Sequence, residues 1–122
     1  MTRTTPSTSR CRFVYTPEYE FDIGAHVFPT RKFKLVRDAL LADGEIGEDA
    51  FLEAPAASDS ELLTVHTPEY LDDLKRAAAT ARTAWSEMPL SDEIVQGFRL
   101  AAGGTLRACR WALEHGLALN LA

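Results

Sequence analysis

The chain has 122 residues, enough for a single domain with a buried core, and its 46% hydrophobic and 25% charged residues are typical of a globular protein rather than a disordered one. Its 13 Lys and Arg residues stand against 18 Asp and Glu residues, and the formal net charge of −5 disfavours a general attraction to nucleic acid or to an anionic membrane. No run approaches the roughly 20 apolar residues that a membrane span requires.

The first ten residues are rich in Thr, Ser and Arg and lack the apolar centre of a secretory signal, so we expect a disordered leader over residues 1–10 and a cytoplasmic protein. Cys11 and Cys109 lie far apart in apolar surroundings, which favours reduced, buried thiols over a disulfide framework. Residues 11–122 are expected to form the folded domain.

A first short strand is expected over Arg12–Tyr15, because this β-rich run is stopped by Pro17. Residues 18–30 show no steady hydrophobic period and contain Gly24 and Pro29, which predicts a long loop. Long ordered loops in compact domains are often functional.

Helical spacing begins near Arg31 and stops at Gly44, a residue suited to the left-handed end of a helix. The expected buried face of this helix consists of Phe33, Val36, Leu40 and Leu41. A second short strand is expected over residues 50–54.

Two helices are predicted from their caps. Ser58 and Glu61 have the spacing of a capping box, which predicts a brief helix. Thr67, followed by Pro68 at a position that needs no amide donor, starts the next helix, whose Ala-rich run continues towards Thr83.

The longest helix is expected from Ser91 to Gly116, after a loop over Trp85–Leu90. Within it, Gly103 and Gly104 interrupt good helix formers at a cost of about 1 kcal/mol per glycine, so we expect another element to pack very close there.

The last six residues, Leu117–Ala122, are predicted to form a third strand. The order of strand, helix, strand, several helices and strand predicts an α/β sheet from which further strands are missing, so the domain looks truncated. In open α/β folds the chemistry lies just beyond the carboxyl ends of parallel strands, which is where this chain stops.

The chain carries none of the usual catalytic motifs. Its three histidines, His26, His66 and His115, form no cluster with metal-ligand spacing, so a metal site built by this chain alone is not expected. His115 suits the end of a helix, His66 is interpreted as a loop hydrogen-bonding residue, and His26 lies in the long loop. Phosphate-loop, serine-elbow and cysteine-nucleophile motifs are absent.

Among the carboxylates, the sequence defines no pair with catalytic geometry. Asp72 and Asp73 are interpreted as part of a solvated helix face, with Lys75 and Arg76 adding mixed surface charge.

Four segments, in the same order and spacing, resemble the N-terminal region of the histone deacetylase family, which includes bacterial acetoin-utilisation and acetylpolyamine amidohydrolase proteins. These segments are Phe13–Pro17, His26–Phe33, Val65–Leu71 and Ala102–Thr105. The run Val-His-Thr-Pro-Glu-Tyr-Leu is the most specific, and the resemblance covers nearly all of the chain after the leader.

The resemblance implies a zinc-dependent hydrolase that removes acetyl groups from lysine or similar amines, on an arginase-like three-layer fold with a parallel sheet flanked by helices. In such enzymes zinc polarises the amide carbonyl and lowers the pKa of the attacking water, while a histidine handles protons. The family's paired histidines follow a strand that looks like Leu117–Ala122, and its metal ligands come later still. No catalytic or metal residue can therefore be placed in this chain, which alone is expected to bind no zinc.

By the same resemblance the chain contributes the periphery of a pocket. The expected wall and rim residues are His26, Phe28, Pro29, Arg31 and Lys32 in the wall, and Glu87, Met88 and Pro89 in the rim. Arg31 and Lys32 are both candidates for the cation near the inner channel, and Glu87 stands one place away from the family's rim aspartate.

Two hypotheses of different classes remain open. The first is the N-terminal part of a deacetylase-like hydrolase, inactive on its own, whose full-length form acts on acetylated lysine or small acetylated amines. The second is a non-catalytic binding or oligomerisation module, in which self-association would cover the exposed edges of a half-sheet.

Overall fold

The computed structural model describes residues 11–25 and 29–122, so the expected leader lies outside the described residues. Three strands are present in this part of the chain: β1 (Arg12–Val14), β2 (Phe51–Leu52) and β3 (Ala118–Asn120). The α-helices are α1 (Lys32–Asp43), α2 (Asp59–Leu62), α3 (Pro68–Lys75) and α4 (Asp92–His115). Short 3-10 turns are η1 (Pro17–Tyr19), η2 (Glu48–Ala50) and η3 (Ala84–Ser86).

The three strands form a parallel sheet in the order β2-β1-β3. Phe13 in the central strand is opposite Phe51 on one side and Leu119 on the other. Because β2 and β3 flank β1 on opposite sides, right-handed crossovers place the connecting helices on opposite faces of the sheet. The α/β class and the three strand positions expected from the sequence are confirmed, with strands shorter than expected.

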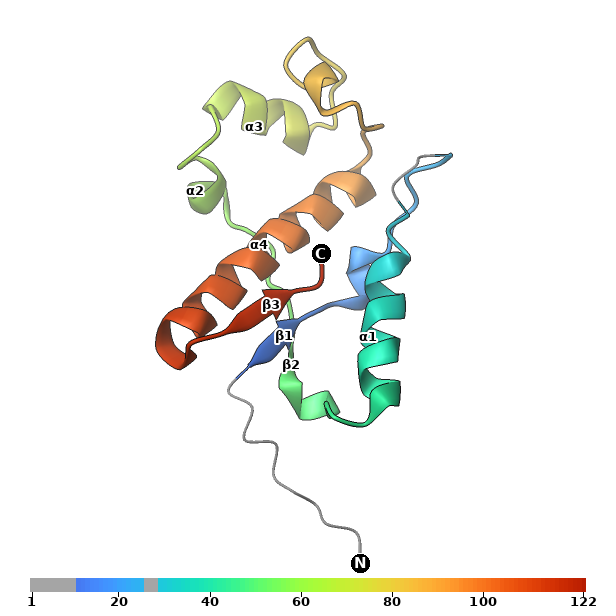
Figure 1. The fold of residues 1–122 in the computed structure, drawn as a ribbon. Coiled ribbons are helices and arrows are strands. Elements are labelled where there is room, and N and C mark those ends of the chain that lie inside the picture. The colour runs from blue at the N-terminus through green and yellow to red at the C-terminus, as the bar shows by residue number, and fades with distance from the viewer. Residues whose placement is uncertain (1–10, 26–28) are drawn as a thin grey trace, which may run out of the picture.

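One face of the sheet packs against α4, which runs along β1 and β3 (Figure 1). Val14 on this face is fully buried, and its neighbour Asn120 donates from Nδ2 to the carbonyl of Ala101 in α4 at 2.9 Å. The other face meets α1, where the guanidinium of Arg37 lies 5.3 Å from the centre of the Phe51 ring.

The two glycines in α4 allow close approach, as the sequence predicts. A Cβ on Gly103 would overlap the carbonyl oxygen of Pro55, in the segment that crosses α4 on its way to α2. A Cβ on Gly104 would overlap the hydroxyl of Tyr19. Glycine is therefore needed at both positions for packing, which offsets its low helix propensity.

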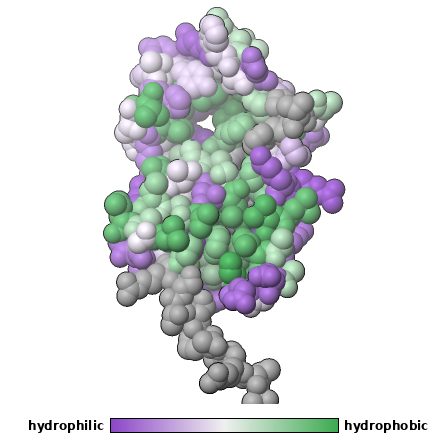
Figure 2. Space-filling view, viewed as in Figure 1, coloured by the Kyte–Doolittle hydropathy of each residue, from purple (hydrophilic) through white to green (hydrophobic). Residues whose placement is uncertain are grey.

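The face of the sheet that meets α1 is only partly covered. Leu119 in β3 is 45% exposed, and Val36 in α1 is 46% exposed although it was expected on the buried face. Figure 2 shows apolar residues gathered over β3 and α1 in the lower half of the molecule. We call this surface, made of Phe13, Leu35, Val36, Leu117 and Leu119, the open face.

The capping signals are confirmed. Ser58 and Glu61 form the capping box of α2, and the Thr67 and Ser91 side chains accept hydrogen bonds at the starts of α3 and α4. The prediction that this third helix continues towards Thr83 is wrong, because α3 ends at Lys75.

The expectation of two buried thiols needs correction. Cys109 is exposed and Cys11 only half-buried, and no disulfide joins them. Residues 20–25 contain no helix or strand, as expected of a loop, although Phe21 and Ile23 are buried. Among the described residues, no helix combines the length and the apolar character needed to cross a membrane.

Candidate functional site

The candidate site lies at the carboxyl ends of the parallel strands. Beyond these ends lie the described part of the loop between η1 and α1, here called the wall loop (residues 20–25 and 29–31), and the rim segment (residues 84–90). Figure 1 shows both at the same end of the molecule. Parallel strands of open α/β sheets present their loops to ligands at this end.

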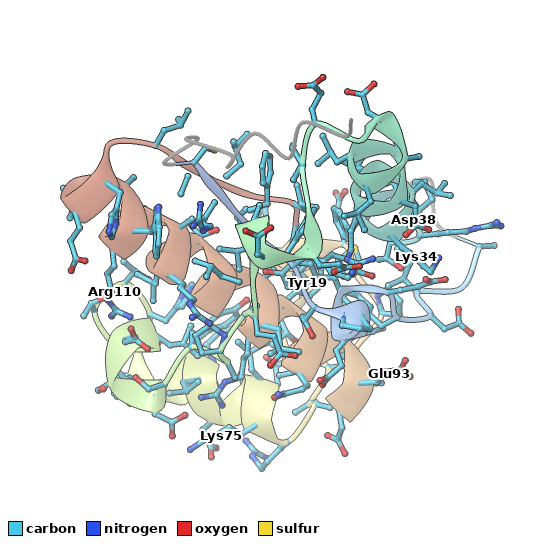
Figure 3. The ribbon with its side chains drawn as sticks, turned by 90° about the horizontal axis from the view of Figure 1, so that it is seen from below. Tyr19, Lys34, Asp38, Lys75, Glu93 and Arg110 are labelled. Carbon is cyan, nitrogen blue, oxygen red and sulfur yellow. The ribbon has the colours of Figure 1, made fainter. Side chains whose placement is uncertain are left out.

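Tyr19 and Asn120 hold the end of β3 to the rest of the core. The Tyr19 hydroxyl donates to Oδ1 of Asn120 at 2.7 Å, and Nδ2 of Asn120 also donates to Thr105 at 3.0 Å. Tyr19 is 1% exposed and lies in the interior of the molecule (Figure 3). Burial raises the pKa of Tyr19 to about 12, so this phenol stays a neutral hydrogen-bond donor at physiological pH.

The wall loop is closed at its base by a buried threonine. The Thr30 hydroxyl donates to the carbonyl of Phe21 at 2.8 Å and accepts from the Phe21 amide at 3.2 Å. Pro29 and Arg31, two of the predicted wall residues, are exposed, and Nζ of Lys32 lies 5.4 Å from the centre of the Phe33 ring. The predicted wall residues His26 and Phe28 lie outside the described residues.

The rim segment packs against the wall loop through one predicted residue. Met88 lies against the buried cluster of Phe21, Ile23 and Ile94. The structure therefore packs the predicted rim residue Met88 against residues that precede the predicted wall, together with Ile94 in the first turn of α4.

The other two rim residues, Glu87 and Pro89, are exposed. Glu87 has a φ of 54°, in the left-handed region that a non-glycine residue adopts only at a cost. This conformation turns the chain at the end of η3 and presents the Glu87 side chain to solvent.

A buried carboxylate anchors the chain that leads to the rim. Asp73 on α3 is 1% exposed in its side chain, and its Oδ2 accepts from Nε of Arg82 at 2.7 Å and from the hydroxyl of Thr80 at 2.8 Å. Oδ1 accepts from Nη2 of Arg76 at 3.2 Å. The interpretation of Asp73 as part of a solvated helix face is wrong, because the chain after α3 turns back over it; its neighbour Asp72 is exposed.

The Asp73 network, formed by Asp73, Arg76, Thr80 and Arg82, continues towards the rim. Thr83 accepts from the Thr80 amide at 2.8 Å, and the Ser86 hydroxyl donates to the carbonyl of Thr83 at 2.9 Å. The hydrogen bond from Arg82, followed by that from Thr80, holds the pKa of Asp73 below the usual carboxyl range. An ionised Asp73 therefore fixes the path of the chain into η3.

The chemistry that these residues offer is positioning and recognition. Within the ranges 11–25 and 29–122, no group of three His, Cys, Asp or Glu side chains could hold a metal ion. The described residues do not fit a zinc site by themselves, and no catalytic step through zinc is derived from them.

Sequence reasoning missed the residues that position the site. Tyr19, Asn120, Asp73 and Arg82 were not singled out as site residues. A usable signal existed for Asn120, which is the polar residue in an otherwise apolar final strand. Asp73 and Arg82 gave no such signal, because nine residues of sequence separate them and no motif joins them.

The fold and the candidate site define a class of protein. It is an α/β domain with a parallel sheet, in which a wall loop and a rim segment lie at the carboxyl ends of the strands. Comparison with known proteins identifies the family, since the histone deacetylase domain matches residues 26–122. The chain belongs to the histone deacetylase family, as the four sequence segments indicated.

Two curated relatives support this assignment. The chain is 30% identical to Histone deacetylase 2 of Arabidopsis thaliana over 124 residues, covering 93% of the chain and 32% of the relative. It is 35% identical to an uncharacterized protein of Picosynechococcus sp. over 111 residues, covering 89% of the chain and 37% of the relative. The chain thus spans about a third of the length of these relatives.

Proposed function

We propose that these residues form the N-terminal part of a zinc-dependent, deacetylase-like amidohydrolase that removes acetyl groups from lysine or related amines. The observation that carries this proposal is the family match over residues 26–122, which includes the rim segment and the part of the wall loop from residue 29 onwards. On this view the domain is an arginase-like three-layer fold, of which the present sheet is one part.

In this function the chain shapes the entrance to the pocket. Arg31 and Glu87 are both exposed and carry opposite charges, so each can orient a polar part of the substrate. The metal chemistry belongs to residues outside the present chain, because the described residues do not fit a zinc site. The 122 residues alone are therefore proposed to be inactive.

The proposal is tested with two preparations. The purified 122-residue chain should bind no stoichiometric zinc and should not hydrolyse an acetyl-lysine reporter. The natural gene product that contains this chain should hydrolyse the reporter and lose that activity with a chelator. Zinc-dependent turnover by the 122 residues, or a folded gene product with bound zinc and no amidase activity, would contradict the proposal.

A second candidate function is a self-associating module. The observation that favours it is the exposed apolar surface beside the β3 edge, where Leu117 is 57% exposed and Leu119 is 45% exposed. Within the described part of the chain β3 pairs on one side only, and such an edge can pair with another chain. A discrete oligomer in sedimentation, dispersed by Leu119→Lys, would favour this function; a monomer at all concentrations would reject it.

A further inference from the structure

A cavity of about 350 Å³ lies between α3 and α4 and is not used by the proposed deacetylase function. Leu71 and Leu74 of α3 line one side, and Ile94, Phe98 and Ala102 of α4 line the other. Figure 2 shows a hollow in the upper half of the molecule, at the level between these helices. Its volume is at the lower end of the range for small-molecule pockets.

The cavity is elongated along α4. Ile94 and Ala102 both line it, and eight residues of an α-helix span about 12 Å. Protein interiors are normally close-packed, so an apolar space of this length between two helices is a poor arrangement unless something occupies it. A linear apolar chain fits this shape.

The charges at the lining select the head group of such a ligand. The charged side chains of the lining are Lys75 and Arg99, and the lining includes no carboxylate. Both cations bind Asp59, through Nζ of Lys75 and through Nη2 of Arg99 at 2.6 Å, so they meet at the same place near the start of α2. Two positive charges against one negative charge leave this group with a net charge of +1.

We propose that the cavity between α3 and α4 binds a linear amphiphile with an apolar chain and a carboxylate head, the head at Lys75 and Arg99. The Ser86 and Met88 side of the cavity belongs to the rim segment, so the bound chain would also contact the inner side of the rim. This site is separate from acetyl-group hydrolysis, and it stands whether or not the proposed deacetylase function is correct.

The test is isothermal titration of the purified protein with decanoate below its critical micelle concentration. Decanoate should bind with one-to-one stoichiometry, and each methylene added from hexanoate to decanoate should tighten binding about fourfold. Decylammonium, which has the same chain and the opposite charge, should bind at least tenfold more weakly. Equal binding of the two amphiphiles, or no binding of decanoate, would overturn the proposal.

Variants locate the site. Lys75→Met keeps the side-chain volume and should weaken decanoate binding about tenfold, since a charge-assisted contact is lost. The matched control is Lys34→Met, because Lys34 also pairs with an aspartate, Asp38, but on α1 far from the cavity (Figure 3). Equal effects of the two variants would overturn the assignment.

A second variant tests the chain-binding part. Ala102→Phe fills the cavity and should abolish decanoate binding, with circular dichroism checking the fold. If this variant fails to fold, the chain-length series on the wild-type protein decides instead: affinity that does not depend on chain length would overturn the proposal.

Discussion

The hydroxyl of Tyr19 and Oδ1 of Asn120 lie 2.7 Å apart although 101 residues separate them in the chain. This hydrogen bond joins the turn after the central strand to the last strand of the sheet. It lies in the interior, where Tyr19 is 1% exposed, and it holds η1 against the carboxyl end of β3.

Tyr19→Phe should lower the free energy of unfolding by about 1 kcal/mol, because one buried hydrogen bond is lost. Asn120→Leu should cost more, since the buried Tyr19 hydroxyl then loses its acceptor and the Ala101 carbonyl loses the donor on Asn120. Urea unfolding measures both changes. Tyr70→Phe is the control, because Tyr70 is only half-buried; an equal cost at Tyr19 and Tyr70 would contradict the prediction.

Gly103→Ala should destabilise the protein by about 2 kcal/mol. Alanine gains about 1 kcal/mol in helix propensity, but its Cβ would overlap the backbone carbonyl of Pro55, and overpacking of this kind costs up to about 3 kcal/mol. The control is Gln96→Ala on the exposed side of α4, which should be neutral or slightly stabilising. A stabilised Gly103→Ala protein would show that the segment before α2 does not cross α4 there.

Asp73→Asn should lower the melting temperature at neutral pH, because the Asp73 network loses its negative charge. Asp72→Asn, on the exposed neighbour, should change it little. The hydrogen bond from Arg82 and then that from Thr80 lower the pKa of Asp73 in the folded state. A carboxyl with a lowered folded pKa stabilises the protein above its unfolded pKa and loses that contribution as the pH falls through the folded pKa.

The difference in melting temperature between wild type and Asp73→Asn should therefore be full at neutral pH and shrink on acidification below about pH 4. Thermal scans by circular dichroism at several pH values measure this difference. A difference that stays constant down to acidic pH would mean that the ionised carboxylate is not what stabilises the rim.

The two thiols should react at different rates with a maleimide. Cys109 is exposed, whereas Cys11 is half-buried and burial raises its pKa, so less of the reactive thiolate is present. Stopped-flow labelling should show a fast and a slow phase of equal amplitude, and Cys109→Ser should remove the fast one. Loss of the slow phase in that variant would reverse the assignment.

Local signals in the sequence were enough to predict where the helices start and to which family the chain belongs. Ser58, Thr67 and Ser91 cap their helices as predicted, because a cap depends on residues within one turn of each other. The close approach at Gly103 was also predictable, since two glycines in a good helix require a packing reason. The segments that resemble the histone deacetylase family are short, and the family match confirms the family that they predicted.

The ends of elements and the burial of polar groups depended on the tertiary structure. The Ala-rich run after Lys75 has high helix propensity, yet the chain leaves the helix there, with Ala77 at a φ of 48°. Turning back lets Arg82 and Thr80 reach Asp73, a gain that no local pattern encodes. Neither the burial of Asp73 nor the meeting of Tyr19 with Asn120 could be read from the sequence.

Caps, hydrophobic spacing and short motifs were enough to predict where the helices begin, the α/β class and the family. Which side chains position the wall and the rim depended on the folded chain. Met88 meets Phe21 and Ile23 through a cluster built by segments more than 60 residues apart, and contacts at that separation form only when the sheet and α4 are in place.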